Sequence, residues 1–197
     1  MTRATPTGPQ AVLITGTVGV GKSTTAEAMG TRLTELGVAH AVLDLDEIRR
    51  CWPSPAGDPF NLAVTLVNLA DLARNFGAAG ARVLVLAGVV ETLTDRRRYA
   101  DAVQLPLTVC RLSLDLAAVR ARIAVRHADD HAGRRWHLDR SGELEAILDA
   151  AAVEDVMIHT AGLGPAEAAA RVLDVVGLGS AAVVGAGAPE PEQTEDR

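Results

Sequence analysis

The chain has 197 residues, a formal net charge of −6 and 48% hydrophobic residues. This length predicts one domain with a sizeable core, and the acidic balance argues against a nucleic-acid-binding protein, which would need a basic surface. The N-terminus lacks the apolar segment of a signal peptide, and no apolar run reaches the roughly 18 residues of a membrane span. Cys51 and Cys110 are too few for a disulfide framework. We therefore expect a cytoplasmic protein with neither nucleic-acid nor membrane partners.

Apolar runs and helical patterns alternate along the whole chain. In chain order, the predicted strands are 11–15, 39–45, 81–88, 107–112 and 155–160. The predicted helices are 22–37, 62–80, 92–102, 115–126, 141–154 and 164–177. The strands are continuous apolar runs rather than alternating ones, which is typical of a parallel sheet covered on both faces. The sequence predicts an α/β fold with a five-stranded parallel sheet between layers of helices.

Three segments fall outside this alternation. Residues 1–10 are polar, and residues 177–197 are rich in Gly and Ala and then in Pro and Glu, so we expect both to be disordered. The charged segment 127–140 is expected to be irregular and mobile, and Ser141 is expected to start the helix that follows it. The folded domain is thus predicted over 11–176.

The most specific motif is GTVGVGKS at residues 16–23, which we call the phosphate loop. It matches the pattern GxxxxGK[ST] and lies, as that pattern requires, between a strand and a helix. The glycines let backbone N–H groups face an anion at the N-terminus of the helix. Lys22 is the only lysine of the chain, and its compact ammonium suits a narrow loop in which a planar guanidinium would be too wide. Ser23 offers a hydroxyl to Mg²⁺. The residues expected to bind the nucleotide are Gly16, Thr17, Gly19, Val20, Gly21, Lys22, Ser23 and Thr24.

The phosphate loop indicates nucleoside triphosphate binding but does not specify a reaction. A GTP-binding protein would need an Asn-Lys-x-Asp motif, and the chain has no second lysine to form one. No LSGGQ signature of a transporter ATPase occurs, and the chain is short for an AAA+ module. The small kinases remain.

In element order and in the phosphate loop, residues 11–176 resemble the P-loop small-molecule kinases related to adenylylsulfate, gluconate, shikimate and adenylate kinases. The nearest resemblance is to adenylylsulfate-kinase-like or chloramphenicol-phosphotransferase-like proteins. It implies a three-layer α/β/α P-loop NTPase fold with strand order 2-3-1-4-5. It also implies transfer of the γ-phosphoryl group of ATP, with Mg²⁺, to a hydroxyl of a small-molecule acceptor. The oligomeric state stays open between monomer and homodimer.

The stretch LDLDEIRR at 43–50 resembles the D-G-D-x-x-R stretch of the sulfate-activating kinases, with Asp44, Asp46 and Arg49 matching and a leucine replacing the glycine. These three residues are expected to contact the acceptor. Asp46 is expected to accept a proton from the attacking hydroxyl and to bind the metal together with Ser23. Arg49 can hold an anionic group of the acceptor. The alternative for Asp46 is the N-cap of a following helix.

Two arginines one helical turn apart, Arg122 and Arg126, precede the segment 127–140. They resemble the R-I-x-x-R at the lid entrance of adenylate-type kinases, which implies that they neutralise charge on the transferred phosphoryl group and that 127–140 is the lid. The alternative for both is a solvated helix face. Asn68 lies on the helix where related enzymes carry a substrate-facing asparagine.

Two other functions remain open at this point. One is a nucleoside or nucleotide kinase, although the loop at 52–61 carries no arginine to bind an acceptor phosphate. The other is a regulatory module that binds ATP without catalysis. The acceptor itself cannot be read from the sequence, because its pocket is formed by this loop and by helix faces that carry no motif.

Overall fold

The predicted alternation of strands and helices is confirmed by the computed structural model, which describes residues 8–179. The sequence predicts disorder over 1–10 and 177–197, of which residues 1–7 and 180–197 lie outside the described ones. Within the described part, Gln10 begins β1 and Leu178 is fully buried, so the ordered domain extends beyond 11–176 at both ends. The five strands form one parallel sheet in the order β2-β3-β1-β4-β5, as the family resemblance implies. The strands are β1 (Gln10–Thr15), β2 (His40–Asp44), β3 (Val83–Ala87), β4 (Leu107–Ser113) and β5 (Val156–His159).

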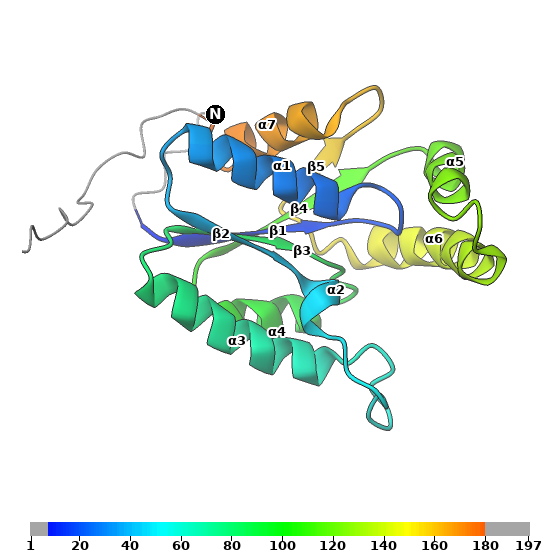
Figure 1. Ribbon diagram of the computed structural model, residues 1–197, viewed down its shortest axis with the longest axis horizontal. Helices are drawn as coiled ribbons and strands as arrows, with labels where there is room; N and C mark the ends of the chain where they lie inside the picture. Colours follow the sequence, from blue (N-terminus) through cyan, green and yellow to red (C-terminus); the bar gives the residue numbers. More distant parts are fainter. Residues whose placement is uncertain (1–7, 180–197) are drawn as a thin grey trace, which may run out of the picture.

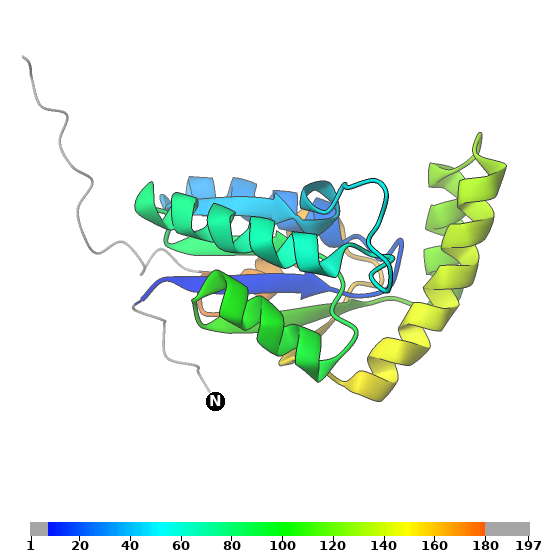
Figure 2. The same ribbon diagram turned by 90° about the horizontal axis from the view of Figure 1, so that it is seen from below.

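Seven helices surround the sheet within the described residues (Figure 1). They are α1 (Lys22–Glu35), α2 (Leu45–Ile48), α3 (Leu62–Ala78), α4 (Leu93–Val103), α5 (Leu116–Arg126), α6 (His131–Ala151) and α7 (Pro165–Val175). Helices α1 and α7 cover one face of the sheet, and α3 and α4 cover the other. Figure 2 shows α5 and α6 standing together beyond the carboxyl ends of the strands. No helix between residues 8 and 179 is both long and apolar enough to cross a membrane.

Both faces of the sheet are buried because successive residues of a strand point to opposite sides. Along β1, Val12 and Ile14 pack with residues of α1 and α7, whereas Ala11 and Leu13 pack with residues of α3 and α4. All four side chains are fully buried. This double burial explains why the strands are continuous apolar runs in the sequence.

The segment 127–140 is not irregular, and the prediction that a helix starts at Ser141 is wrong. Helix α6 begins ten residues earlier, where the Asp130 carboxylate caps it by accepting a hydrogen bond from the Gly133 N–H (2.9 Å). Ser141 lies buried in the middle of this helix. The core-facing residues of α6 begin only at Ser141, and they are Ser141, Leu144 and Leu148. The first half of α6 is charged because it does not pack on the sheet, and so it lacks the apolar pattern of a helix.

The second half of α6 is tied to the sheet by an ion cluster around Arg111 of β4. The Arg111 side chain is only 1% exposed, and its guanidinium contacts Glu145 (3.0 Å), Asp149 (2.7 Å) and, more distantly, Glu154 (3.6 Å). A buried guanidinium requires this compensation, because an unpaired charge in the interior is strongly unfavourable. The cluster thereby fixes α6 relative to β4.

Replacing Arg111 with leucine is expected to lower the free energy of unfolding by about 3 kcal/mol, because it leaves the carboxylates of the cluster without their cation. Urea denaturation of the two proteins measures this difference. The control is Arg74→Leu, which breaks the exposed pair between Arg74 and Asp71 on α3 and should change stability by no more than about 0.5 kcal/mol. Equal effects of the two substitutions would contradict a stabilising role for the Arg111 cluster.

Candidate active site

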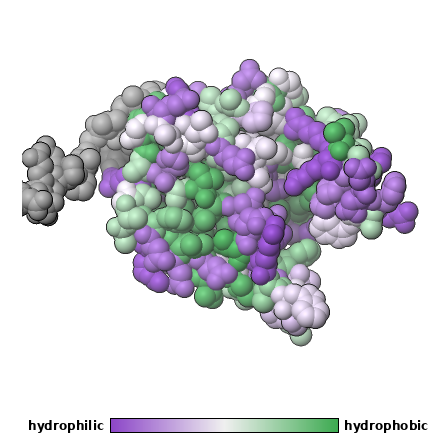
Figure 3. Space-filling model, viewed as in Figure 1, coloured by the Kyte–Doolittle hydropathy of each residue, from purple (hydrophilic) through white to green (hydrophobic). Residues whose placement is uncertain are grey.

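A cavity of about 1110 Å³ opens at the carboxyl ends of the strands, where ligands bind in open α/β sheets. Its walls come from the phosphate loop, from β2 and α2, from the loop before α3, from the residues after β3 and from α5 and α6. Figure 3 shows that hydrophilic residues gather over α5 and α6 at this end of the molecule. The cavity therefore brings together segments that are far apart in the sequence.

The phosphate loop has the backbone conformation that its glycines permit. Gly16 and Gly19 have positive φ angles of 140° and 82°. A Cβ atom on Gly16 would lie 2.6 Å from the Leu112 carbonyl oxygen, and one on Gly19 would lie 2.7 Å from the Ile123 side chain. The N-cap residue of α1, Gly21, supplies no side-chain hydrogen bond, and the first turn of α1 has no acidic residue. The N–H groups at this end of α1 are thus left for an anion.

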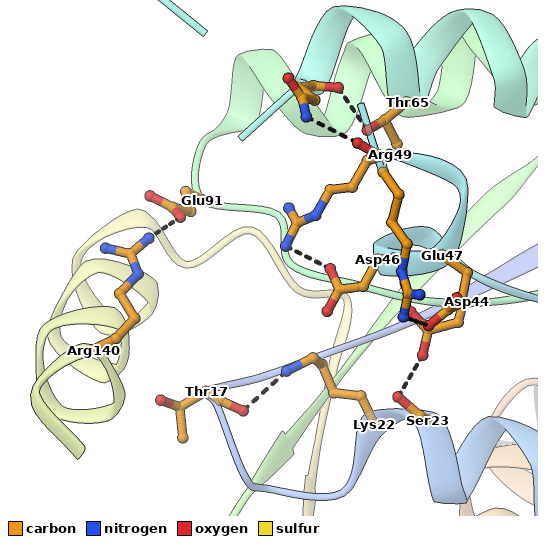
Figure 4. Close-up of polar contacts among 12 residues, drawn as sticks. Thr17, Lys22, Ser23, Asp44, Asp46, Glu47, Arg49, Thr65, Glu91 and Arg140 are labelled. Atoms are coloured by element: carbon orange, nitrogen blue, oxygen red, sulfur yellow. Dashed lines mark hydrogen bonds and ion pairs between the residues drawn. The ribbon is translucent and has the colours of Figure 1, made fainter. Parts of the chain in front are cut away.

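Lys22 lies at the centre of the phosphate loop and is half-buried. Its ammonium donates hydrogen bonds to the carbonyl oxygens of Gly16 and Thr17, both at 3.1 Å; Figure 4 shows the bond to Thr17. Burial lowers the pKa of Lys22 to about 8, although the negative charges of Asp46 and Asp44 oppose this shift. Near neutral pH the ammonium is therefore charged but poorly hydrated, which favours pairing with a phosphate.

This pKa predicts how nucleotide affinity varies with pH. Bound phosphates favour the ammonium form, so affinity for ATP should be constant below about pH 7 and fall about tenfold per pH unit above the lowered pKa of about 8. Calorimetry in buffers of different ionisation enthalpy should show proton uptake on binding at about pH 9 and none at about pH 6. Constant affinity up to about pH 9 would show that Lys22 stays charged in the empty loop.

Asp44 and Ser23 form the polar pair at the base of the cavity. The Ser23 hydroxyl donates to one Asp44 carboxylate oxygen (2.6 Å), and the other oxygen accepts from the Asp46 N–H (2.9 Å). Asp44 is therefore the N-cap of α2, and the alternative that Asp46 caps the helix is wrong, because α2 begins at Leu45, two residues earlier than a cap at Asp46 requires. Asp46 lines the cavity and pairs with Arg49 (2.5 Å).

The Ser23–Asp44 pair could also bind a metal ion together with the nucleotide. No group of three or more His, Cys, Asp or Glu residues within the described part of the chain is arranged to hold a metal ion by itself. Mg²⁺ in nucleotide sites is commonly bound by one or two protein oxygens together with phosphates and waters. The Ser23 hydroxyl and the Asp44 carboxylate fit that requirement. Asp44, which contacts Ser23, is therefore a further candidate for the metal, and the binding of the metal by Asp46 stays a prediction.

The two arginines of α5 lie beside the phosphate loop, as the resemblance implies. Arg122 donates to the Val20 carbonyl oxygen (3.0 Å), and both Arg122 and Arg126 line the cavity. Gly16 and Thr17, by contrast, do not line it. The Thr17 hydroxyl instead donates to the Ser141 carbonyl oxygen in a buried bond of 2.6 Å, which joins the phosphate loop to α6.

Asn68 is the expected substrate residue that the structure does not bring to the cavity. Its side-chain amide donates to the Ile48 carbonyl oxygen (2.7 Å) at the end of α2. It is absent from the cavity walls. In the structure the amide joins α3 to the end of α2, and the predicted contact of Asn68 with substrate stays a prediction.

Sequence reasoning missed one group of cavity residues. Arg140 of α6 pairs with Glu91 (Figure 4). The guanidinium carbon of Arg140 lies 5.2 Å from the centre of the Phe60 ring. Nearby, the His127 and His137 rings stack with centres 4.2 Å apart. His137 and Arg140 are three residues apart, a spacing that places both on one face of a helix. This spacing could have identified them, but the sequence did not predict that this segment is helical.

Comparison with known proteins gives a family and a fold. The family described as adenylylsulphate kinase matches residues 8–147. No curated protein matches the chain.

Three solved structures show the same fold, as follows. The tunicamycin resistance protein of Deinococcus radiodurans is 24% identical, with 86% of this chain and 96% of that chain covered and a TM-score of 0.62. Shikimate kinase from Acinetobacter baumannii is 16% identical, with 85% and 93% covered and a TM-score of 0.59. A gluconokinase from Sinorhizobium meliloti 1021 is 16% identical, with 88% and 93% covered and a TM-score of 0.57.

Proposed function

The chain belongs to the adenylylsulphate kinase family, and from that premise we propose that it transfers the γ-phosphoryl group of ATP to a hydroxyl group of a small molecule. The observation that carries the proposal is that Lys22, the Ser23–Asp44 pair and Asp46 meet in one cavity. Phosphoryl transfer depends mainly on positioning and on charge stabilisation, and these groups supply both. Cys51 and Cys110 form no disulfide, in keeping with a cytoplasmic location.

Each residue has a distinct task in this proposal. The loop N–H groups and Lys22 bind the phosphates, while Ser23 and Asp44 hold Mg²⁺, which neutralises phosphate charge when bound. Asp46 orients the acceptor hydroxyl and takes its proton as the oxygen bonds to the γ-phosphorus and ADP leaves. Arg122 and Arg126 compensate charge from the α5 side of the cavity.

Incubation with Mg²⁺, ATP and a metabolite extract tests the proposal. We expect products heavier by one phosphoryl group, which are absent with the Lys22→Ala variant. Phosphorylated nucleosides or nucleotides among the products would identify the alternative nucleotide kinase. Tight ATP binding without any transfer would instead identify a non-catalytic ATP-binding module.

The segment 127–140, which includes the first half of α6, is expected to act as the lid. None of its residues is buried, and both His137 within it and Arg126 just before it line the cavity. Hydrogen exchange across 127–140 should slow when a non-hydrolysable ATP analogue binds. Unchanged exchange there, together with protection of the phosphate loop, would contradict this role.

A further inference from the structure

We propose that the acceptor of this kinase carries no anionic group, so that the chain does not phosphorylate adenylylsulphate or another acceptor bound through phosphate or sulfate. This inference rests on the proposed function and specifies its substrate class. It concerns the part of the cavity formed by lining residues within 44–65, 89–99 and 136–144, which we call the acceptor wall.

The acceptor wall has an excess of negative charge. Apart from Asp44, which the proposed function assigns to Mg²⁺, its lining residues include five carboxylates and three guanidinium groups. The five carboxylates are those of Asp46, Glu47, Asp58, Glu91 and Asp95. An anion brought against this wall would meet like charge, which disfavours its binding.

Each arginine of the acceptor wall is already paired with a carboxylate of the protein. Arg49 pairs with Asp46 (2.5 Å), and Arg50 pairs with Glu47 (2.6 Å). Arg140 pairs with Glu91 inside the cavity (Figure 4) and, on its other side, with an exposed carboxylate of α6. A phosphate or sulfate would have to displace one of these carboxylates to obtain a guanidinium partner.

The helix N-terminus at this wall is occupied as well. The two carboxylate oxygens of Asp58 accept hydrogen bonds from the Leu62 N–H (2.8 Å) and the Ala63 N–H (2.9 Å), which are the first N–H groups of α3. These bonds lower the pKa of Asp58, so the carboxylate remains ionised. The protein's own carboxylate thus fills the place that an anion would take.

The nucleotide side of the same cavity has the opposite arrangement. Within residues 8–179, none of Lys22, Arg122 and Arg126 forms an ion pair with a carboxylate. Lys22 and Arg122 contact only backbone carbonyl oxygens through their charged ends. Positive charge is therefore available to bind the phosphates of ATP. On the acceptor wall, the positive charge is already paired with carboxylates of the protein.

Aromatic groups on the acceptor wall indicate what replaces an anionic contact. Phe60 is 44% exposed and Trp136 is 53% exposed, so both rings are open to a ligand. Burial raises the pKa of Tyr99 to about 12, which keeps its hydroxyl neutral and able to donate a hydrogen bond. These groups suit a neutral or cationic hydroxyl compound with a flat or apolar portion.

The charge requirement can be tested by binding alone, with adenylylsulphate as the anionic probe and the nucleotide site filled by Mg²⁺ and ADP. The Glu91→Gln variant releases Arg140 from its partner in the cavity, so it should bind the probe at least about tenfold more tightly than the unmodified protein. The control Glu143→Gln removes the exposed partner of Arg140 (2.9 Å, carboxylate 63% exposed) and should leave probe affinity within about twofold. Equal affinity of the unmodified protein and Glu91→Gln for the probe would overturn the inference.

A second measurement uses phosphoryl transfer. A metabolite extract is separated on an anion exchanger, and each fraction is incubated with the protein, Mg²⁺ and labelled ATP. Label should enter compounds of the unbound fraction, and label only in the bound fraction would overturn the inference. Absence of label from every fraction would refute the proposed kinase, whereas the charge of the acceptor wall is still decided by the binding of the probe.

Discussion

Replacement of Lys22 with alanine is expected to reduce phosphoryl transfer by at least about 10³-fold and to weaken ATP binding. The ammonium lies inside the phosphate loop, within 3.1 Å of the carbonyl oxygens of Gly16 and Thr17, at the place where the β- and γ-phosphates bind in such loops. No other lysine exists to replace it. Steady-state kinetics with calorimetric titration of ATP measures both effects.

The variant Lys22→Arg separates charge from shape. It keeps the positive charge, but a planar guanidinium is too wide for the space between the loop carbonyls, so we expect it to be nearly as inactive as Lys22→Ala. Arg120→Ala, on an exposed position of α5 outside the cavity walls, serves as control and should retain activity. Turnover by Lys22→Arg near that of the unmodified protein would contradict the steric explanation.

Replacement of Asp46 with asparagine is expected to reduce turnover by about 10²–10⁴-fold while changing ATP affinity only a few-fold. The Asp46 carboxylate lines the cavity, and its negative charge is the strongest of those that raise the pKa of Lys22, which places it close to the phosphate site. Asparagine keeps the shape but accepts no proton. Turnover with the identified acceptor and calorimetry with ATP measure the two quantities.

The structure makes this experiment sharper than the sequence did. Asp44 caps α2, so Asp46→Asn leaves the cap intact, and loss of activity cannot come from an unfolded α2. Asp71→Asn, on the exposed face of α3, is the matched control and should be fully active. Full activity of Asp46→Asn would mean that another group takes the proton, and Asp44 would be examined first.

The sheet and the phosphate loop were predictable because local sequence determines them. Buried parallel strands require continuous apolar runs, and a loop with two close backbone approaches requires glycine at fixed places, as Gly16 and Gly19 show. The order of the strands in the sheet could not be predicted from the apolar runs themselves. It came from the family resemblance.

The errors concern residues whose role depends on distant partners. Leu45 extends an apolar run that predicts a strand, yet it starts α2 and is buried against Gly88, where a Cβ atom would lie 2.5 Å from the Leu45 side chain. That contact explains how a leucine occupies a place where the family motif has glycine. The bond of the Asn68 amide to the Ile48 carbonyl, twenty residues away, could not be read from the local sequence. Arg140 was missed because Phe60 and Glu91 reach it only in the folded chain.

The bond between Thr17 and Ser141 has a consequence for the kinetic order of the reaction. Thr17 belongs to the phosphate loop, and Ser141 directly follows Arg140, a residue of the acceptor wall, in α6. A change in the loop on nucleotide binding would therefore be passed through Ser141 to Arg140. Helix α6 has 21 residues, and Arg111 of β4 holds its second half through Glu145 and Asp149, so such a change acts on the part of α6 that precedes this anchor. We expect the acceptor wall to reach its final geometry after ATP is bound. We expect a compulsory sequence of binding, nucleotide first and acceptor second.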